Sequence, residues 1–211
     1  RGESYSVGVR KDARIFVVSA TGVVHLDQSG DIVHSSSATL NHEIAVVFHD
    51  DSTVTTFTHY KWQPDIRNLY VVQANKDYVE RSRQEFKFGD KQFYYSSVVL
   101  RDGSVRLIGE IDNDLAVVGF TPDGTPDLSF GKDGVAVVPV LSANDAGYRA
   151  TVADDGKLVI VGHADNGVNR DFVIVRLNKN GSVDESFGNR GKVVTNWGGD
   201  DQAYAVEILP N

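Results

Sequence analysis

The chain contains one segment twice, and this duplication restricts the possible folds more than any other feature. Residues 113–138 and residues 170–195 align without a gap. Each copy has an apolar run, an Asx-Gly turn, the pattern Asp-x-Ser-Phe-Gly and a second apolar run after a further glycine. A repeat of this length is a unit that buries its apolar face only against neighbouring units. The sequence therefore predicts an array of repeated units.

Degenerate copies of the same unit extend through the rest of the chain. Four openings carry a tyrosine seven positions before an Asp or Asn, and a further opening near Glu43 lacks the tyrosine. Each opening except the last is followed by three more β-rich runs separated by turns. We expect units at about 1–40, 41–91, 92–144 and 145–200, and a partial unit at 201–211. Together they form a single repeat domain.

Short β-rich runs separated by Asp-Gly turns are hairpin signals, and no helical periodicity competes with them. The fourth runs are expected near 32–33, 86–88, 135–138 and 193–196. Four strands per unit, repeated at about 40 to 57 residues, are typical of propeller blades. We predict an all-β, β-propeller-like array of about four four-stranded blades plus the first strand of a fifth. An incomplete propeller is one form that such an array can take.

The composition excludes several classes of partner. The 211 residues carry a formal net charge of -8, which opposes binding to the phosphates of nucleic acid. No apolar run approaches the ~20 residues of a membrane helix, so membrane insertion is not expected. The chain has no cysteine, which excludes a disulfide framework and a thiolate metal site. It has no methionine and starts at Arg1, so we expect it to be a piece of a longer protein.

Two strings carry a resemblance to a known family. DGTPDLSFG from Asp123, NGSVDESFG from Asn180 and the opening Ala-Tyr-Ala-Val from Ala203 resemble the bacterial delta-60 repeat family. This resemblance covers about half of the chain, whereas the first two units are similar to generic NHL and SMP-30 repeats. It implies a propeller-like array in large secreted or surface-attached bacterial proteins, and it supplies no catalytic residues.

The motif itself has a physical interpretation. Phe130 and Phe187 are predicted to fill the same kind of gap between neighbouring blades. Gly131 and Gly188, which follow them, permit the bend before the last strand.

Aromatic side chains are the first candidates for binding. One set should occupy equivalent places on the opening strands: Tyr5, Tyr95, Tyr148 and Tyr204. Their hydroxyls could form a ring that holds a sugar or a peptide, but the favoured interpretation is packing between blades, each hydroxyl bonded to a backbone group. The second set could stack on a sugar or serve in packing: Tyr60, Trp62 and Trp197.

Carboxylates are the candidates for metal binding. Two loops between second and third strands carry oxygen ligands suited to calcium, and their carboxylates are Asp112, Asp114, Asp165 and Asp171. Asx residues also serve hairpin turns, and the spacing departs from the EF-hand loop. The six histidines lack metal-ligand spacing. Asp200 and Asp201 are interpreted as a solvated loop.

These observations favour a non-catalytic structural or protein-interaction module of a secreted or surface-attached bacterial protein. The expected partner is a protein or glycan at the cell surface. Residues 203–209 are expected to form a strand against the fourth unit, and the open blade end could support self-association. The alternatives are a carbohydrate-binding, lectin-like propeller and a metal-dependent, lactonase-like hydrolase.

Overall fold

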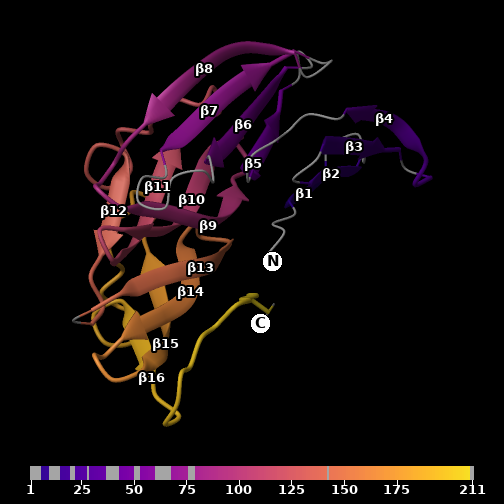
Figure 1. Cartoon of the computed structure of the whole chain (residues 1–211). Coiled ribbons are helices and arrows are strands. Elements are labelled where there is room, and N and C mark those ends of the chain that lie inside the picture. Colours follow the sequence, from indigo (N-terminus) through magenta and orange to yellow (C-terminus); the bar gives the residue numbers. More distant parts are fainter. Residues whose placement is uncertain are drawn as a thin grey trace. The chain divides into compact units, whose positions relative to one another are not determined.

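A computed structural model describes residues 6–9, 15–19, 22–27, 29–36, 43–49, 53–59, 68–75, 79–141 and 143–209. The described residues contain sixteen strands in four antiparallel sheets of four, each built from consecutive strands (Figure 1). The predicted all-β array of four-stranded, blade-like sheets is confirmed. No helix in this part of the chain is long and apolar enough to cross a membrane.

The chain divides into two compact units, residues 1–87 and residues 88–211, and we describe each by itself. The first unit holds two sheets, β1 (Ser6–Val9), β2 (Ile15–Ser19), β3 (Gly22–Leu26), β4 (Ile32–Ser36) and β5 (Glu43–Phe48), β6 (Val54–His59), β7 (Leu69–Ala74), β8 (Glu80–Phe86). The second unit holds the other two, β9 (Gln92–Val99), β10 (Val105–Ile111), β11 (Asp114–Phe120), β12 (Val135–Val138) and β13 (Asp145–Val152), β14 (Leu158–Asp165), β15 (Arg170–Leu177), β16 (Lys192–Thr195).

One strand lies where the sequence did not indicate it. The fourth strand of the second sheet is β8, Glu80–Phe86, whereas the apolar pattern had placed it near 86–88. Its sequence, ERSRQEF, is exposed at every position but the last. Charged side chains are a common protection for an edge strand, which pairs through its backbone on one side only. An apolar pattern therefore does not mark it.

The expected opening strand at 203–209 is also not formed. Residues 201–209 belong to no strand and make no ladder, although Ala203 N donates a hydrogen bond to Gly162 O at 3.1 Å. Tyr204 is 64% exposed and Leu209 is 75% exposed. Asp201 N also donates to Arg170 O, at 2.6 Å. Since strand geometry needs a continuous row of backbone partners, these two bonds are not enough to create it. The segment nevertheless contacts the fourth sheet, because the ring of Tyr204 stacks on that of Tyr148 in β13.

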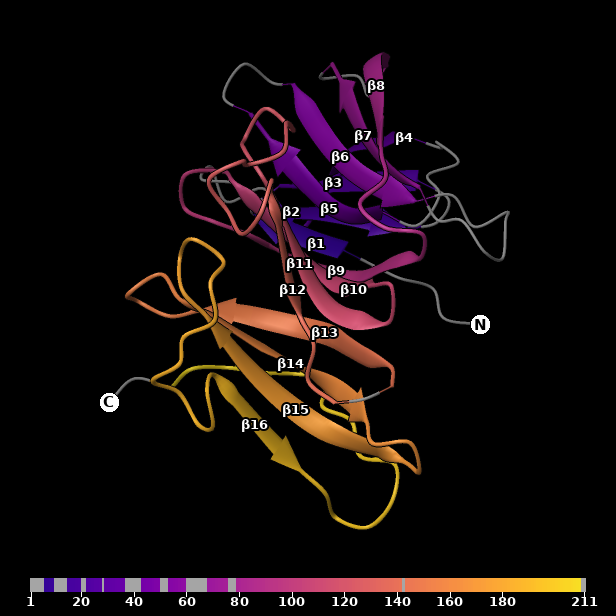
Figure 2. The same ribbon diagram turned by 90° about the vertical axis from the view of Figure 1, so that its left-hand side faces the viewer.

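The core of the second unit lies between its two sheets (Figure 2). Both sheets contribute aliphatic side chains that are fully or almost fully buried, among them Ile108, Leu115, Val117, Leu158, Ile160, Val173 and Val175. The third strands differ in burial. Strand β11 is buried at every position after Asp114, but β15 alternates, with Val173, Val175 and Leu177 buried. Strand β11 is therefore covered on both faces, whereas β15 is fully covered on one face only.

Candidate functional site

Tyr95 and Tyr148 are placed by the same irregularity in their strands. The β9–β10 register shifts between Ile108 and Gly109: Ile108 lies opposite Ser96 and Gly109 lies opposite Tyr94, so Tyr95 is the extra residue of β9. The β13–β14 register shifts in the same way around Tyr148. A β-bulge of this kind redirects a side chain out of the regular alternation. Equivalent positions for these two tyrosines, predicted from the sequence, are therefore confirmed.

The glycines opposite the bulges make this geometry possible. A Cβ atom at Gly109 would lie 1.8 Å from the carbonyl oxygen of Phe93, and one at Gly162 would lie 1.8 Å from that of Ala146. Real Cβ contacts never come this close, so only glycine fits at either place. The sequence contains both glycines, but their role is apparent only from the register.

Three tyrosine rings form a ladder, which we call the tyrosine ladder and define as Tyr95, Tyr148 and Tyr204. The Tyr95 and Tyr148 rings meet edge to face with centroids 5.1 Å apart, and the Tyr148 and Tyr204 rings stack at the same distance with an interplanar angle of 5°. Tyr95 is 42% exposed and Tyr204 is 64% exposed. The ladder therefore exposes a stacked aromatic surface to solvent.

Two of the three hydroxyl groups of the ladder share a side-chain acceptor. Tyr148 and Tyr204 each donate a hydrogen bond to Oε1 of Gln202, at 3.1 Å and 2.7 Å. The sequence interpretation had expected backbone acceptors, and for these two tyrosines it is wrong. The reason is that the segment after β16 brings Gln202 next to the bulge of β13. Burial, followed by the nearby Tyr204, raises the pKa of the Tyr148 hydroxyl.

His163 lies beneath the ladder. Its ring centroid is 5.3 Å from that of Tyr148, and its side chain is 2% exposed. Among the residues that the structure describes, no group forms a hydrogen bond with either ring nitrogen. Burial, followed by Arg170, lowers the pKa of His163, so the ring is an uncharged support for Tyr148.

Trp197 is the most exposed of the described aromatic candidates. It is 76% exposed, and its ring lies 4.9 Å from that of Phe172. Its backbone N–H donates to Oδ2 of Asp201 at 2.7 Å, while Asp200 accepts from the N–H of Arg170 at 3.0 Å. Asp200 is exposed and Asp201 is partly exposed, as expected for a solvated loop, and both carboxylates also accept hydrogen bonds from backbone N–H groups.

The Asp201 contact is one of three equivalent loop closures. The side chain at the start of a blade accepts a hydrogen bond from the N–H four residues earlier, in the pairs Phe88–Gln92 (2.9 Å), Leu141–Asp145 (3.0 Å) and Trp197–Asp201 (2.7 Å). A glutamine and two aspartates perform the same task, so residue identity alone does not reveal it. The signal that would have identified these three residues is their position, because each stands three residues before a tyrosine of the ladder.

The carboxylates considered for calcium lie in two separate hairpins. Asp112 accepts from the N–H of Lys91, Asp165 from that of Gly167, and Asp171 from the Asn166 side chain. Burial, then Asp145 and Asp112, raises the pKa of Asp114. Among the residues that the structure describes, no three His, Asp or Glu side chains are grouped for a metal ion. The contacts of Asp165 and Asp171 lie within their own hairpin, and Asp112 binds the backbone just before β9.

Three of the predicted aromatic residues, Tyr5, Tyr60 and Trp62, lie outside the described residues.

The Asp-x-Ser-Phe-Gly motif forms the same structure twice. Asp127 accepts hydrogen bonds from the N–H and Oγ of Ser129, and Asp184 does the same for Ser186. Hydrogen bonds from Ser186, then Lys157 and Arg176, hold the pKa of Asp184 well below its ordinary value. For Asp127, burial opposes ionisation, but Ser129 and Arg106 lower the pKa on balance. Both motifs are thus anchored by an ionised aspartate.

The two phenylalanines of the motif are not in the same environment. Phe130 is fully buried between the sheets of the second unit, as predicted, but Phe187 is only partly buried. The expectation of one identical pocket is therefore wrong. Within the second unit, the turn at residues 178–182 covers Phe130, whereas no described segment of that unit takes the corresponding position at Phe187.

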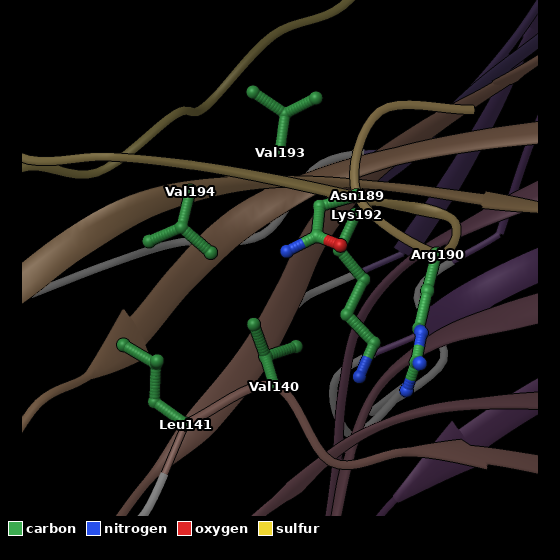
Figure 3. A pocket seen from close by; sticks show the side chains of 7 residues that line it. All are labelled: Val140, Leu141, Asn189, Arg190, Lys192, Val193 and Val194. Carbon is green, nitrogen blue, oxygen red and sulfur yellow. The ribbon is translucent and has the colours of Figure 1, made fainter. Parts of the chain in front are cut away.

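A hollow of about 500 Å³ lies beside the second motif (Figure 3). Its lining combines aliphatic and cationic side chains from the β12–β13 connection and from residues 189–194, and consists of Val140, Leu141, Asn189, Arg190, Lys192, Val193 and Val194. The Lys192 ammonium donates to the carbonyl oxygen of Pro139.

The comparisons with known proteins agree with a propeller-type repeat. A family model described as a β-propeller domain of unknown function, DUF5122, matches residues 153–187. This segment runs from the turn before β14 to the second Ser-Phe pair. No curated protein matches the chain in sequence.

Similar solved structures have low sequence identity. They include a protein of unknown function from Bacteroides caccae (11% identity, TM-score 0.45), with 92% of this chain and 88% of that chain covered. The extracellular domains 1–2 of Drosophila semaphorin 1b follow (8% identity, TM-score 0.49; 83% and 40% covered). A gluconolactonase of Xanthomonas campestris is also similar (10% identity, TM-score 0.43; 92% and 62% covered).

The four meandering sheets and the family match define the class. The chain is an all-β, propeller-like repeat protein. The segment most similar to a known family is its fourth blade, which matches the β-propeller domain DUF5122 over residues 153–187.

Proposed function

We propose that the chain is a non-catalytic protein-interaction module of a secreted or surface-attached bacterial protein, and that the tyrosine ladder is its contact surface. The observation that carries this proposal is the stacked, exposed arrangement of Tyr95, Tyr148 and Tyr204. The export of the parent protein rests on the resemblance of the repeats to delta-60 arrays.

The physical properties of the ladder suit protein recognition. Tyrosine provides a large, amphipathic contact at low cost in side-chain entropy, and aromatic residues are enriched at interfaces. Stacking and the shared acceptor Gln202 restrict Tyr148 and Tyr204 before a partner arrives. A surface ordered in advance loses less free energy on binding.

The experiment selects peptides from a displayed random library on the immobilised chain. Tyr204→Ala is expected to abolish binding of the selected peptides, because it removes the outer ring and one hydroxyl. Val168→Ala is the matched control, since Val168 is 93% exposed on another loop. Selected peptides that bind both variants equally would contradict the proposal.

A second candidate, carbohydrate binding, is favoured by Trp197. An exposed indole supported by Phe172 is a suitable platform for the apolar face of a sugar ring. A glycan array tests it. Binding that is lost in Trp197→Ala and kept in Tyr204→Ala would favour the glycan function over the peptide function.

A further inference from the structure

Within the second unit, a turn of one blade covers the motif of the preceding blade. Gly131 N donates a hydrogen bond to the carbonyl oxygen of Asn180 at 2.7 Å. A Cβ atom at Gly181 would lie 2.7 Å from Gly131 N and 3.0 Å from the Phe130 ring. The turn at residues 178–182 therefore seals Phe130, and glycine is needed both for its φ of 81° and for the close approach.

The same turn occurs in the first blade. At residues 178–182, Asn178 N donates to Ser182 O and Gly181 N donates to Asn178 O. At residues 27–31, Asp27 N donates to Asp31 O and Gly30 N donates to Asp27 O, with a Gly30 φ of 86°. Ser29 and Gly30 are exposed, and no described residue lies within 4 Å of a Cβ atom built on Gly30. We call residues 27–31 the first-blade turn.

The second motif has the geometry of the first. Phe187 N donates to Asp184 O and Gly191 N donates to Phe187 O, as Phe130 N does to Asp127 O and Gly134 N to Phe130 O. Arg176 lies over one face of the Phe187 ring, 4.5 Å from its centroid, as Arg106 does for Phe130. The ring is only partly buried.

We propose that the first-blade turn of a second copy of this chain docks on Phe187 and Gly188, as residues 178–182 dock on Phe130 and Gly131. Ser29 O of the second copy would accept the hydrogen bond from Gly188 N, and Gly30 would lie against the Phe187 ring. The interface joins two different surfaces, so the copies associate head to tail.

The charges of the two surfaces are opposite. The first-blade turn carries the carboxylates of Asp27 and Asp31. Arg190 and Lys192 follow Gly188 and line the adjacent hollow (Figure 3). Opposite charges at a contact favour the correct orientation of two copies. This association does not depend on the tyrosine ladder, so it goes beyond the function proposed above.

The lack of cysteine in the chain permits a direct test by cross-linking. Ser29→Cys and Asn189→Cys are made as separate single variants, and both positions are exposed. A short bifunctional maleimide is expected to give a dimer when the two variants are mixed, and not with either alone. Val168→Cys in place of Asn189→Cys is the matched control, and its yield sets the background.

Adding Phe187→Ala to the Asn189→Cys variant is expected to reduce the dimer to that background. Far-ultraviolet circular dichroism checks that this variant remains folded, and Phe187→Leu should keep an intermediate yield if Ala does not fold. Dimers from Ser29→Cys alone would overturn the head-to-tail arrangement. The double variant Ser29→Cys, Asn189→Cys is treated in the same way. If it forms a cross-link within one molecule and no dimers, the proposal that a second copy docks on Phe187 is wrong. Selected peptides would still bind in either case, so the two proposals fail separately.

Discussion

Arg106 and Arg176 lie on different strands of their blades and yet make the same contact. Arg106 is on β10, opposite Gly119 of β11, and Arg176 is on β15, opposite Val159 of β14. Each pairs with the aspartate of its own motif and lies 4.5 Å from the centroid of the motif phenylalanine. The guanidinium therefore occupies the same position in both blades, although a different strand supplies it.

Loss of the arginine should affect the two blades unequally. Arg106→Leu leaves Asp127 without its cation in a site where the arginine side chain is 6% exposed, so the free energy of unfolding should fall by about 3 kcal/mol. Arg176→Leu should cost about 1 kcal/mol, because Arg176 is 27% exposed and Lys157 still pairs with Asp184 at 3.0 Å. Urea unfolding measures both, with Arg101→Gln in an exposed turn as the control. Equal losses would contradict this account.

Acid should destabilise the chain in part through Asp184. Its pKa is lowered on folding by Ser186, Lys157 and Arg176. A lowered pKa stabilises the folded state above the ordinary pKa of about 4, and this stability is lost as the pH falls from there towards the folded value. We expect the stability of Asp184→Asn to depend less on pH below about 4 than that of the unmodified chain. Urea unfolding across this range measures it, and the neighbouring Glu185→Gln serves as control; parallel curves for Asp184→Asn and the unmodified chain would refute the assignment.

The two motif phenylalanines should differ in their contribution to stability. Phe130→Ala removes a fully buried ring and should cost about 3 to 5 kcal/mol. Phe187→Ala should cost about 1 to 2 kcal/mol at low protein concentration, because its ring is only partly buried. Thermal and chemical unfolding of both variants provide the comparison. A loss under 1 kcal/mol for Phe130→Ala would show that the motif does not hold the sheets together.

Two glycines with similar φ angles allow the cost of backbone strain to be measured separately from the cost of steric crowding. Gly181 has a φ of 81° and lies against Phe130, while Gly167 has a φ of 87° and no described residue lies within 4 Å of a Cβ atom built on it. Alanine at Gly167 should cost about 1 kcal/mol, from the backbone conformation alone. Alanine at Gly181 should cost at least about 2 kcal/mol more, since it also separates the turn from Phe130. Similar losses at the two positions would mean that the turn does not seal the ring.

The segment after β16 should make a measurable contribution. Removal of residues 203–211 deletes the stacked ring of Tyr204 and the hydrogen bond from Ala203 to Gly162. We expect the melting temperature to fall by a few degrees, about 2 to 4 °C, in a thermal scan. Tyr204→Phe keeps the stack and loses only the hydroxyl, so it should melt within about 1 °C of the unmodified chain. An unchanged melting temperature after the deletion would show that the segment does not stabilise the blade.

The sequence by itself determined the elements of the blades. Turn residues and alternating apolar runs are local signals, because a hairpin pairs residues that are close in the chain. They placed the first three strands of every sheet, the equivalence of Tyr95 and Tyr148, and the burial of Phe130. They missed β8, whose charged residues suit an edge, and predicted a strand at 203–209 that forms no ladder.

Only the tertiary structure decided which side chains meet. The arginine over each motif ring comes from β10 in one blade and β15 in the next, and spacing along the chain cannot reveal this exchange. The loop closures use Gln92, Asp145 and Asp201 interchangeably. Phe130 and Phe187 share one motif and differ in burial because a following turn seals only the first among the described residues. Contacts across strands and between blades depend on which neighbour is present, and the sequence of one repeat unit does not specify its neighbour.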